Sequence, residues 1–577
     1  MPTDPRTHLA ELLAAALASA FPEESRVPVL LERPKQAGHG DYACSVALQL
    51  AKSLKRNPRE VAQALLAALP PSSLLAKAEI AGAGFINLFL NPAARQRVVS
   101  DILANPDAYG RIAYGRAKRV QVEFVSANPT GPLHVGHGRG AAYGASLANV
   151  LEAAGFAVER EYSVNDAGRQ MDILALSTWL RYLELHGLSV PFPDNAYQGD
   201  YVKDMARAVA DQHADRYVHS PERLMQGLPS GAEDEEARLD ALIANAKALL
   251  GADYAYIHDY ALTEQLGDCR NDLAEFGVEF QHWFSERSLF DSGQVERALA
   301  QLERAGHLYV QDGAKWFRSQ AFGDEKDRVV QRENGQYTYF ASDIAYHLNK
   351  LERGFDVAID VWGADHHGHI SRVKAALQAL GVDPSRVFVA LVQFAVLYRD
   401  GKKVSMSTRK GEFVTLRDLR GEVGNDAARF FYVLRKRDQH LDFDLDLAKS
   451  QSNENPVYYV QYAHARVCSV MEQWGGDAQA LSSCDLAALD SEHEQQVLRL
   501  LMDYPAVIED AARDFAPHLI AFYLKELAAA FHSYYNSNRF LVDDERVRLA
   551  RLALVVSLRY VLRNGLRLLG VSAPAKM

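Results

Sequence analysis

The sequence has few cysteines and no long apolar segment. Its 577 residues include only four cysteines, whose spacing forms neither a Cys-x-x-Cys pair nor a zinc framework. We therefore expect no zinc and a reducing, cytoplasmic location. No apolar run approaches the roughly 18 residues that a membrane-spanning helix needs. The first residues carry acidic side chains in place of a basic start, which argues against a secretory signal.

Low-complexity segments and internal repeats are also absent, and acidic residues outnumber basic ones. Lys and Arg total 63 and Asp and Glu total 74, which gives a formal net charge of −11. An acidic chain is not a general polyanion binder, so any nucleic-acid contact must use local basic patches. One such patch is expected in residues 546–577, which contain seven cations and no acidic residue. The length predicts about four domains.

The order of predicted elements indicates an α/β fold. We expect a split, doubly wound parallel sheet between a small α/β N-terminal domain and an all-α C-terminal domain. The expected boundaries are 1–95 for the N-terminal domain, 96–178 and 281–400 for the two halves of the sheet domain, 179–280 for a mainly helical insertion, 401–452 for a loop and connecting region, and 453–577 for the helical domain. Residues 91–116 are expected to be a connection.

The middle of the chain has the strand–loop–helix pattern that is typical of nucleotide-binding folds. Residues 119–126 are rich in β-branched and aromatic residues and predict a strand, which the segment from Pro129 to Gly131 cannot continue. A helix of small residues is expected over 136–154. The pattern returns with a helix over 340–353, a buried strand over 356–362, a helix over 370–380 and one further strand over 387–397.

Two histidines follow the loop that ends the first predicted strand. His134, Gly136 and His137 lie at a helix start, and histidines three residues apart share one helical face. Backbone N–H groups at a helix N-terminus favour phosphate, and imidazoles can donate hydrogen bonds to phosphoryl oxygens. The tetrapeptide alone also fits ordinary surface histidines. Its place after a strand and a Gly/Pro loop favours a nucleotide site.

A cationic segment follows the last predicted strand. It could close on a triphosphate and neutralise a departing pyrophosphate, although a basic surface turn has the same composition. Its residues are Lys402, Lys403, Val404, Ser405, Met406, Ser407, Thr408, Arg409, Lys410 and Gly411.

Together these two segments resemble the paired signatures of class I aminoacyl-tRNA synthetases. Further segments are similar specifically to the arginyl-tRNA synthetase family and cover nearly the whole chain; they are residues 38–43, 84–89, 122–131, 339–343, 442–449, 453–466 and 562–571. The resemblance implies that the protein activates L-arginine with ATP and Mg²⁺ and transfers it to the terminal adenosine of tRNA(Arg). It also implies a monomer in which activation requires the tRNA.

The resemblance also implies roles for individual residues. The catalytic residues would be His134, His137, Arg409, Lys403 and Lys410. ATP would contact the two histidines together with Gly136, Asp365, His366, Met406 and Ser407. Arginine would be bound by Glu123, Asn128, Tyr339, Asp343 and His366. The tRNA contacts would be Asn87, Phe89, Tyr458, Tyr462, Arg466, Arg563 and Met577. The signature loop departs from the family pattern, because Ser405 and Thr408 stand where lysines often do.

Two other functions fit parts of the sequence. Asp365, His366, His367 and His369 could bind a transition metal, which would make the protein a metal-dependent hydrolase. The same segment follows a predicted parallel strand, where nucleotide folds bind their ligands, so metal ligation is the weaker hypothesis. A protein that binds tRNA without charging it is the third hypothesis, and the altered signature loop is its only support.

Overall fold

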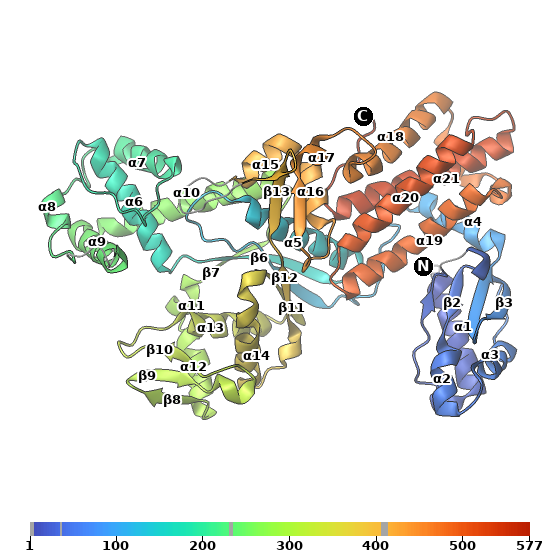
Figure 1. The fold of residues 1–577 in the computed structure, drawn as a ribbon, viewed down its shortest axis with the longest axis horizontal. Helices are drawn as coiled ribbons and strands as arrows, with labels where there is room; N and C mark the ends of the chain where they lie inside the picture. The colour runs from blue at the N-terminus through green and yellow to red at the C-terminus, as the bar shows by residue number, and fades with distance from the viewer. Residues whose placement is uncertain (1–4, 35–36, 230–234, 405–413) are drawn as a thin grey trace.

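The computed structural model describes residues 5–34, 37–229, 235–404 and 414–577. Figure 1 shows a central sheet that lies between a helical insertion and a bundle of long C-terminal helices, with the N-terminal domain next to that bundle. The N-terminal domain and the helical bundle lie on the same side of the central sheet, opposite the insertion. Among the described residues, no helix is both long and apolar enough to cross a bilayer.

The N-terminal domain is an antiparallel sheet covered by helices. Its strands are ordered β1-β2-β4-β3. The elements are α1 (Pro5–Ala20), β1 (Leu31–Glu32), β2 (Tyr42–Cys44), α2 (Val46–Leu54), α3 (Pro58–Ala67), β3 (Leu75–Ala81) and β4 (Phe85–Leu90). Residues 91–116 are more than a connection, because they contain the helix α4 (Pro92–Ala104). Val99 and Ile102 of α4 are fully buried, so apolar packing holds this helix in place.

The central sheet is parallel throughout, as the sequence predicts. Its strand order is β12-β11-β5-β6-β7. The strands are β5 (Arg119–Glu123), β6 (Ala157–Val164), β7 (His282–Ser285), β11 (Val357–Gly363) and β12 (Val387–Val392). The helices α5 (Val135–Ala153), α13 (Tyr339–Glu352) and α14 (Ile370–Ala379) connect or flank them. Because all five strands run in one direction, their carboxyl ends form a single edge.

Two predicted strands have different limits in the structure. The single strand expected over 387–397 is wrong: β12 ends at Val392, and β13 (Ala395–Arg399) belongs to a separate sheet with β14 (Lys402–Lys403) and β15 (Leu441–Asp444). The chain leaves the first sheet at Gln393, whose N–H donates to the carbonyl of Arg437. The strand expected over 119–126 ends at Glu123, because Val125 and Ser126 adopt positive φ angles.

The insertion is helical, as expected, and has its own apolar core around Leu176, Trp179 and Ile243. Its helices are α6 (Arg169–Leu185), α7 (Asp200–His213), α8 (Pro221–Leu224), α9 (Glu235–Leu250) and α10 (Asp253–Glu275). Two short helices then follow, α11 (Arg287–Asp291) and α12 (Gln294–Arg304). After them comes a small antiparallel sheet that the sequence did not predict; its strands are β8 (Leu308–Gln311), β9 (Ala314–Phe317) and β10 (Arg328–Gln331).

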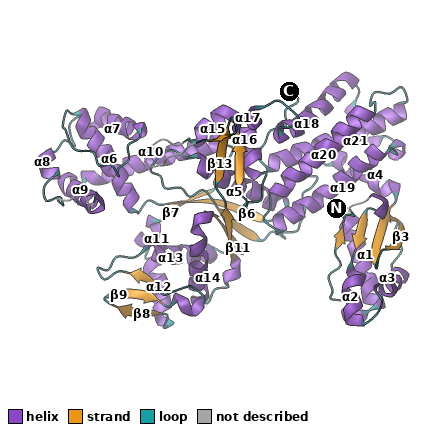
Figure 2. Ribbon diagram, viewed as in Figure 1, coloured by secondary structure: helices purple, strands orange, loops and turns teal. Residues whose placement is uncertain are grey.

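The C-terminal region is helical, as predicted, and Figure 2 shows it as a group of long helices. These are α18 (Pro456–Trp474), α19 (Glu492–Arg513), α20 (His518–Ser537) and α21 (Glu545–Leu568), preceded by α15 (Leu416–Val423), α16 (Asn425–Val433) and α17 (Leu445–Lys449). The start of α18 follows from local chemistry. The Asn455 side chain accepts hydrogen bonds from the N–H groups of Val457 and Tyr458, and Pro456 occupies the first turn.

Helix α5 packs so closely on the central sheet that one glycine in it has no room for a side chain. A Cβ atom at Gly144 would lie 2.3 Å from the Phe124 ring, whereas one at Gly140 would meet no atom within 4 Å. We expect Gly144→Ala to lower stability by about 1–3 kcal/mol through overpacking. Gly140→Ala is the matched control and should be neutral or stabilising by up to about 1 kcal/mol. Urea unfolding of both variants measures the difference, and equal effects would contradict the packing described.

Candidate functional site

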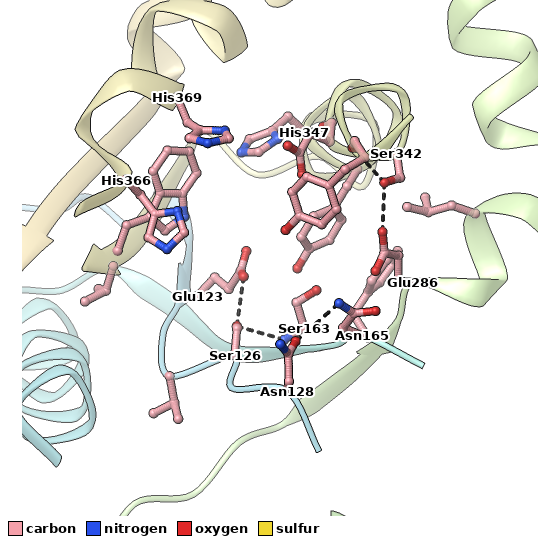
Figure 3. Close-up of a pocket in the computed structure, with 18 of the residues that line it drawn as sticks. Glu123, Ser126, Asn128, Ser163, Asn165, Glu286, Ser342, His347, His366 and His369 are labelled. Carbon is pink, nitrogen blue, oxygen red and sulfur yellow. Dashed lines mark hydrogen bonds between the residues drawn. The ribbon is translucent and has the colours of Figure 1, made fainter. Parts of the chain in front are cut away.

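A cavity of about 200 Å³ opens at the carboxyl edge of the central sheet. Figure 3 shows that its lining comes from several strand ends and from one helix. Glu123 ends β5, Ser163 lies near the end of β6, and Glu286 directly follows β7. The first turns of α13 contribute Tyr339 and Asp343 from the opposite side. The parallel sheet therefore brings together side chains that are more than 200 residues apart in the sequence.

Three carboxyl groups converge on this cavity, from Glu123, Glu286 and Asp343. Burial raises the pKa of Asp343 to about 7, and the nearby Glu286 and Glu123 act in the same direction. Burial also raises the pKa of Glu286, which accepts a 2.8 Å hydrogen bond from the Ser342 hydroxyl. Close carboxyl groups in a partly desolvated site favour a cationic ligand, because its charge offsets their mutual repulsion.

Beneath the cavity lies an ion pair network around Lys350, a residue of α13 that is completely buried. Its ammonium group donates to Asp360 Oδ1 at 2.6 Å and also to the carboxylate of Glu123. Burial raises the pKa of Asp360, but the charges of Lys350 and His347 outweigh it and hold that pKa well below its usual range. The network therefore ties β5, β11 and α13 together directly under the site.

His347 extends this network toward the cavity. Its Nε2 atom lies 2.9 Å from Asp360 Oδ2, and its Nδ1 atom lies 2.7 Å from the backbone carbonyl oxygen of Asp343. Because both ring nitrogens face acceptors, the doubly protonated ring satisfies both contacts. Burial lowers the pKa of His347, but Asp360 more than compensates, so the net shift is upward. The ring fixes the first turns of α13, which carry Asp343.

The histidine pair lies at the N-terminus of α5. The rings of His134 and His137 stack with their centroids 3.7 Å apart. His134 Nδ1 accepts a 3.1 Å hydrogen bond from the Gly136 N–H, while the His134 N–H donates to His137 Nδ1 at 3.3 Å. Burial and the neighbouring His134 lower the pKa of His137 to about 3, and burial lowers the pKa of His134. Both rings are therefore neutral at pH 7 and can act as hydrogen-bond donors without carrying charge.

The chain beyond the signature loop pairs with the segment that leads into this histidine pair. His134 and Thr415 form an antiparallel bridge. The N–H of Val135 donates to the carbonyl of Val414 at 3.1 Å, and the N–H of Leu416 donates to the carbonyl of Leu133 at 2.8 Å. Segments that are about 280 residues apart in the sequence, and that carry the two predicted signatures, are thus joined by backbone hydrogen bonds.

The structure brings together all five predicted arginine-binding residues, because Glu123, Asn128, Tyr339, Asp343 and His366 all line the cavity. Asp365 adjoins it, with its carboxylate 3.8 Å from the His366 ring. The histidines of α5 are not part of the cavity lining. Lys403 lies in β14, which pairs with β13. Four further predicted residues lie outside the described residues: Met406, Ser407, Arg409 and Lys410.

Sequence reasoning missed Glu286, Ser163 and Asn165, all of which line the cavity. Ser163 and Asn165 lie at the end of β6, where the rule that ligands bind at the carboxyl ends of parallel strands applies. Glu286 follows β7, which has only four residues and was not predicted. The sequence signal for Glu286 was its position directly after the short segment 282–285, which contains Trp283 and Phe284.

The predicted tRNA-binding residues of α18 form a compact aromatic group. Tyr458 and Tyr462 stack with their ring centroids 5.7 Å apart, and the Arg466 guanidinium lies 4.5 Å from the rings of both Tyr462 and Tyr535. Flat rings beside a cation are suited to unpaired bases. In the N-terminal domain, the Asn87 side chain is buried, which argues against a direct contact with RNA. Its neighbour Phe89 lies 4.4 Å below the Lys77 ammonium.

Four of the seven cations in the basic patch expected in residues 546–577 make ion pairs with acidic residues. Arg551 pairs with the buried Glu494 at 2.8 Å, and Arg563 pairs with Asp107. Other segments also supply acidic partners to Arg546 and Lys576. Residues 546–577 carry only positive charges in the sequence because their acidic partners lie elsewhere in the chain. Met577, the remaining predicted contact, is exposed.

The predicted metal cluster has no supporting geometry. Asp365, His366 and His367 are exposed, and the rings of His366 and His369 lie 5.7 Å apart. Within the described part of the chain, no group of three or more His, Cys, Asp or Glu side chains is arranged to hold a metal ion. Nothing in the structure therefore supports the metal-dependent hydrolase.

Comparisons with known proteins agree along the whole chain. Three family models match: "Arginyl tRNA synthetase N terminal domain" over residues 7–90, "tRNA synthetases class I (R), catalytic domain" over 98–444, and "DALR anticodon binding domain" over 460–577. The chain is 66% identical to the arginine–tRNA ligase of Nitrosospira multiformis, covering 100% of this chain and 99% of that protein. It is 66% identical to the arginine–tRNA ligase of an Azoarcus species, with 100% of both chains covered. The solved structure of Thermus thermophilus arginyl-tRNA synthetase is similar with a TM-score of 0.77 at 25% identity, over 99% of this chain and 100% of that one.

The buried network makes a prediction about stability. Replacing Lys350 by methionine leaves the buried Asp360 without its ammonium partner, and this should cost about 3–5 kcal/mol. Lys449→Met is the matched control, because Lys449 makes a 2.8 Å ion pair with Glu422 but is partly exposed. That change should cost less than about 1 kcal/mol. Urea titration compares the two variants, and a similar small loss in both would show that the network does not hold the site together.

Proposed function

The chain belongs to the arginyl-tRNA synthetase family, and from that membership we propose that it is an arginine–tRNA ligase. It would activate L-arginine with ATP and transfer the arginyl group to tRNA(Arg). The observation that carries the proposal is the acidic cavity at the carboxyl edge of the parallel sheet, where Glu123, Glu286 and Asp343 meet. A carboxylate cluster of this kind matches a guanidinium group, which carries a positive charge and five donors.

Within this cavity the roles divide according to the contacts of each group. Glu123 already binds the buried ammonium of Lys350, so Asp343 and Glu286 are the carboxylates available to the arginine side chain. Tyr339 and Asn128 lie at the more exposed rim and would bound the substrate on either side. An analogue without the positive charge would leave carboxyl groups unpaired. Polar sites reject similar amino acids in this way, without a separate hydrolytic editing step.

The histidine pair of α5 is proposed to act on the phosphates of ATP. A carboxylate oxygen of arginine attacks the α-phosphorus, the bond to the bridging oxygen breaks, and pyrophosphate leaves. Neutral His134 and His137 can donate hydrogen bonds to the α-phosphoryl oxygens as charge develops there. Gly136 would allow close approach of the nucleotide, and we propose that Asp365 and His366 contact its adenosine.

The signature loop would supply the charge for the leaving pyrophosphate. Lys403 lies at its base in β14, and Met406, Ser407, Arg409 and Lys410 follow in the sequence. We propose Lys403, Arg409 and Lys410 as the cations that replace the lysines expected in this family. ATP is the substrate as its Mg²⁺ complex.

The second step transfers the arginyl group from the adenylate to the 2′-hydroxyl of the terminal adenosine, and AMP leaves. Tyr458, Tyr462 and Arg466 on α18 are proposed to stack on anticodon bases, as their ring and cation geometry suggests. Phe89 is the more accessible of the two predicted contacts in the N-terminal domain. We also propose that the protein acts as a monomer in the cytoplasm, which agrees with its four free cysteines.

Aminoacylation with each amino acid in turn tests the proposed function. Arginine alone should be attached to tRNA(Arg), in an ATP-dependent reaction. His137→Ala should lower arginine activation, measured by pyrophosphate exchange with tRNA present, by about a hundredfold, or roughly 3 kcal/mol. His307→Ala, outside the cavity, is the control and should retain full activity. Charging with another amino acid, or tRNA binding without charging, would contradict the proposal, and a loss below about fivefold would remove His137 from the catalytic role.

Arginine binding should depend on pH because burial raises the pKa of Asp343 to about 7 in the free protein. A bound guanidinium favours the ionised carboxyl, so arginine binding should release a proton below pH 7. The dissociation constant should therefore rise as pH falls below about 7, by up to about tenfold per pH unit, and stay level above it. Calorimetry in buffers of different ionisation enthalpy measures the proton release. Asp343→Asn should bind arginine more weakly and lose this pH dependence; an unchanged profile in that variant would contradict the assignment.

A further inference from the structure

One completely buried arginine of α5 makes its hydrogen bonds to backbone carbonyls. Arg139 lies four residues beyond the first residue of the helix, and its side chain is 1% exposed. Its guanidinium donates to three backbone carbonyls, those of Gln393 at 2.7 Å, Gln439 at 2.8 Å and Lys436 at 3.0 Å. Arg139 forms no ion pair with any carboxylate in the described residues. The cation is thus bound by backbone alone, from two separate segments.

Both segments lead directly into the sheet that supports the signature loop. Gln393 lies two residues before β13, and Gln439 lies two residues before β15. Strand β13 is the centre of this sheet: it pairs in parallel with β15 and antiparallel with β14, which is Lys402–Lys403. The Arg139 guanidinium therefore links the histidine-bearing helix to the two segments that lead into β13 and β15, and β13 in turn pairs with β14 at the base of the signature loop.

The other end of the signature loop is attached to the same helix by different means. Thr415 bridges His134, and the flanking backbone bonds join Val135 to Val414 and Leu133 to Leu416. Helix α5 thus contacts the chain both before and after the loop. Beyond the loop, the Tyr432 hydroxyl of α16 also donates to the carbonyl of Val135 at 2.8 Å, whereas the hydrogen bonds to the segment before the loop come from the Arg139 side chain.

Burying a guanidinium that has no ion-pair partner costs desolvation free energy. Burial lowers the pKa of Arg139 to about 10, so the group remains charged at neutral pH and its desolvation is not relieved by an ion pair. An apolar side chain of similar volume avoids this desolvation cost. What such a side chain cannot supply is a planar fork whose donors reach three carbonyls at once.

We propose that Arg139 is a positioning residue for arginine activation, which holds the base of the signature loop at a fixed place relative to His134 and His137. The inference rests on the proposed function, in which the histidines and the loop cations act on the same triphosphate. Because the histidines lie at the start of α5 and Lys403 lies in β14, which pairs with β13, a small shift of β13 would separate them. Misplacement by about 1 Å can cost about a hundredfold in rate.

Two substitutions test this role against a matched control. Arg139→Lys keeps the charge but loses the fork, and Arg139→Met removes the buried charge together with all its donors. Arg429→Lys is the control, because Arg429 is also fully buried, has no ion pair in the described residues, and donates to the carbonyls of Phe276 at 3.1 Å and Gly277 at 3.0 Å. Those carbonyls belong to the turn directly after α10.

The measurements are pyrophosphate exchange with tRNA present, normalised to active sites, and amide hydrogen exchange on the full chain. Both Arg139 variants should lose at least about tenfold in kcat while KM for arginine changes less than about threefold. Amides of β13 and β15 should lose protection in these variants and not in Arg429→Lys, whose kcat should stay within about twofold of the wild type.

The results that would contradict the positioning role differ from the result that would contradict the proposed function. Equal kcat in the Arg139 and Arg429 variants, or unchanged protection of β13 and β15, would overturn the positioning role. A rise in KM for arginine with unchanged kcat would also overturn it, because that result places Arg139 in substrate binding. If the wild-type protein does not activate arginine, the proposed function fails instead, and hydrogen exchange still decides whether Arg139 anchors the sheet.

Discussion

The acidic cavity depends on an ammonium group that lies beneath it. Lys350 is completely buried and joins Glu123 of β5 to Asp360 of β11, while His347 binds the other oxygen of Asp360. These contacts fix two strand ends and one helix relative to one another. They also satisfy Glu123 from below, whereas Asp343 and Glu286 make no ion pair with any of the described residues. Carboxyl groups held in this way attract a positively charged side chain, and burial makes the attraction stronger than it would be in water.

The phosphate-binding side is held by a different kind of contact. The stacked rings of His134 and His137 begin α5, and backbone hydrogen bonds to Thr415 and its neighbours attach the segment before the helix to the chain beyond the signature loop. Arg139 attaches the same helix to the carbonyl of Gln393, two residues before β13. Neutral rings at this place can recognise developing negative charge without adding a fixed positive one. The two sides of the proposed site therefore differ in electrostatics: carboxyl groups line the cavity, and neutral imidazoles begin α5.

Sequence reasoning succeeded where residues are close in the chain or belong to a distinctive motif. Tyr339 and Asp343 share one helical face, and the pattern of apolar and small residues was enough to predict the parallel sheet. It failed where the outcome depends on tertiary contacts. Glu286 follows a strand of four residues, too short for a periodic pattern to show. The strand expected over 387–397 divides between two sheets because Gln393 bonds to Arg437, a contact that no local pattern indicates. The cations of α21 looked like an RNA surface, but Arg551 is neutralised by Glu494 from another helix.

The central claim is that the cavity recognises the positive charge of a guanidinium through Asp343 and Glu286. Calorimetric titration of the full chain with L-arginine and with L-citrulline, a neutral molecule of nearly the same shape, tests it most directly. The account predicts that arginine binds at least about a hundredfold more tightly, because citrulline leaves buried carboxyl groups without a cation. Equal affinities for the two molecules would contradict it.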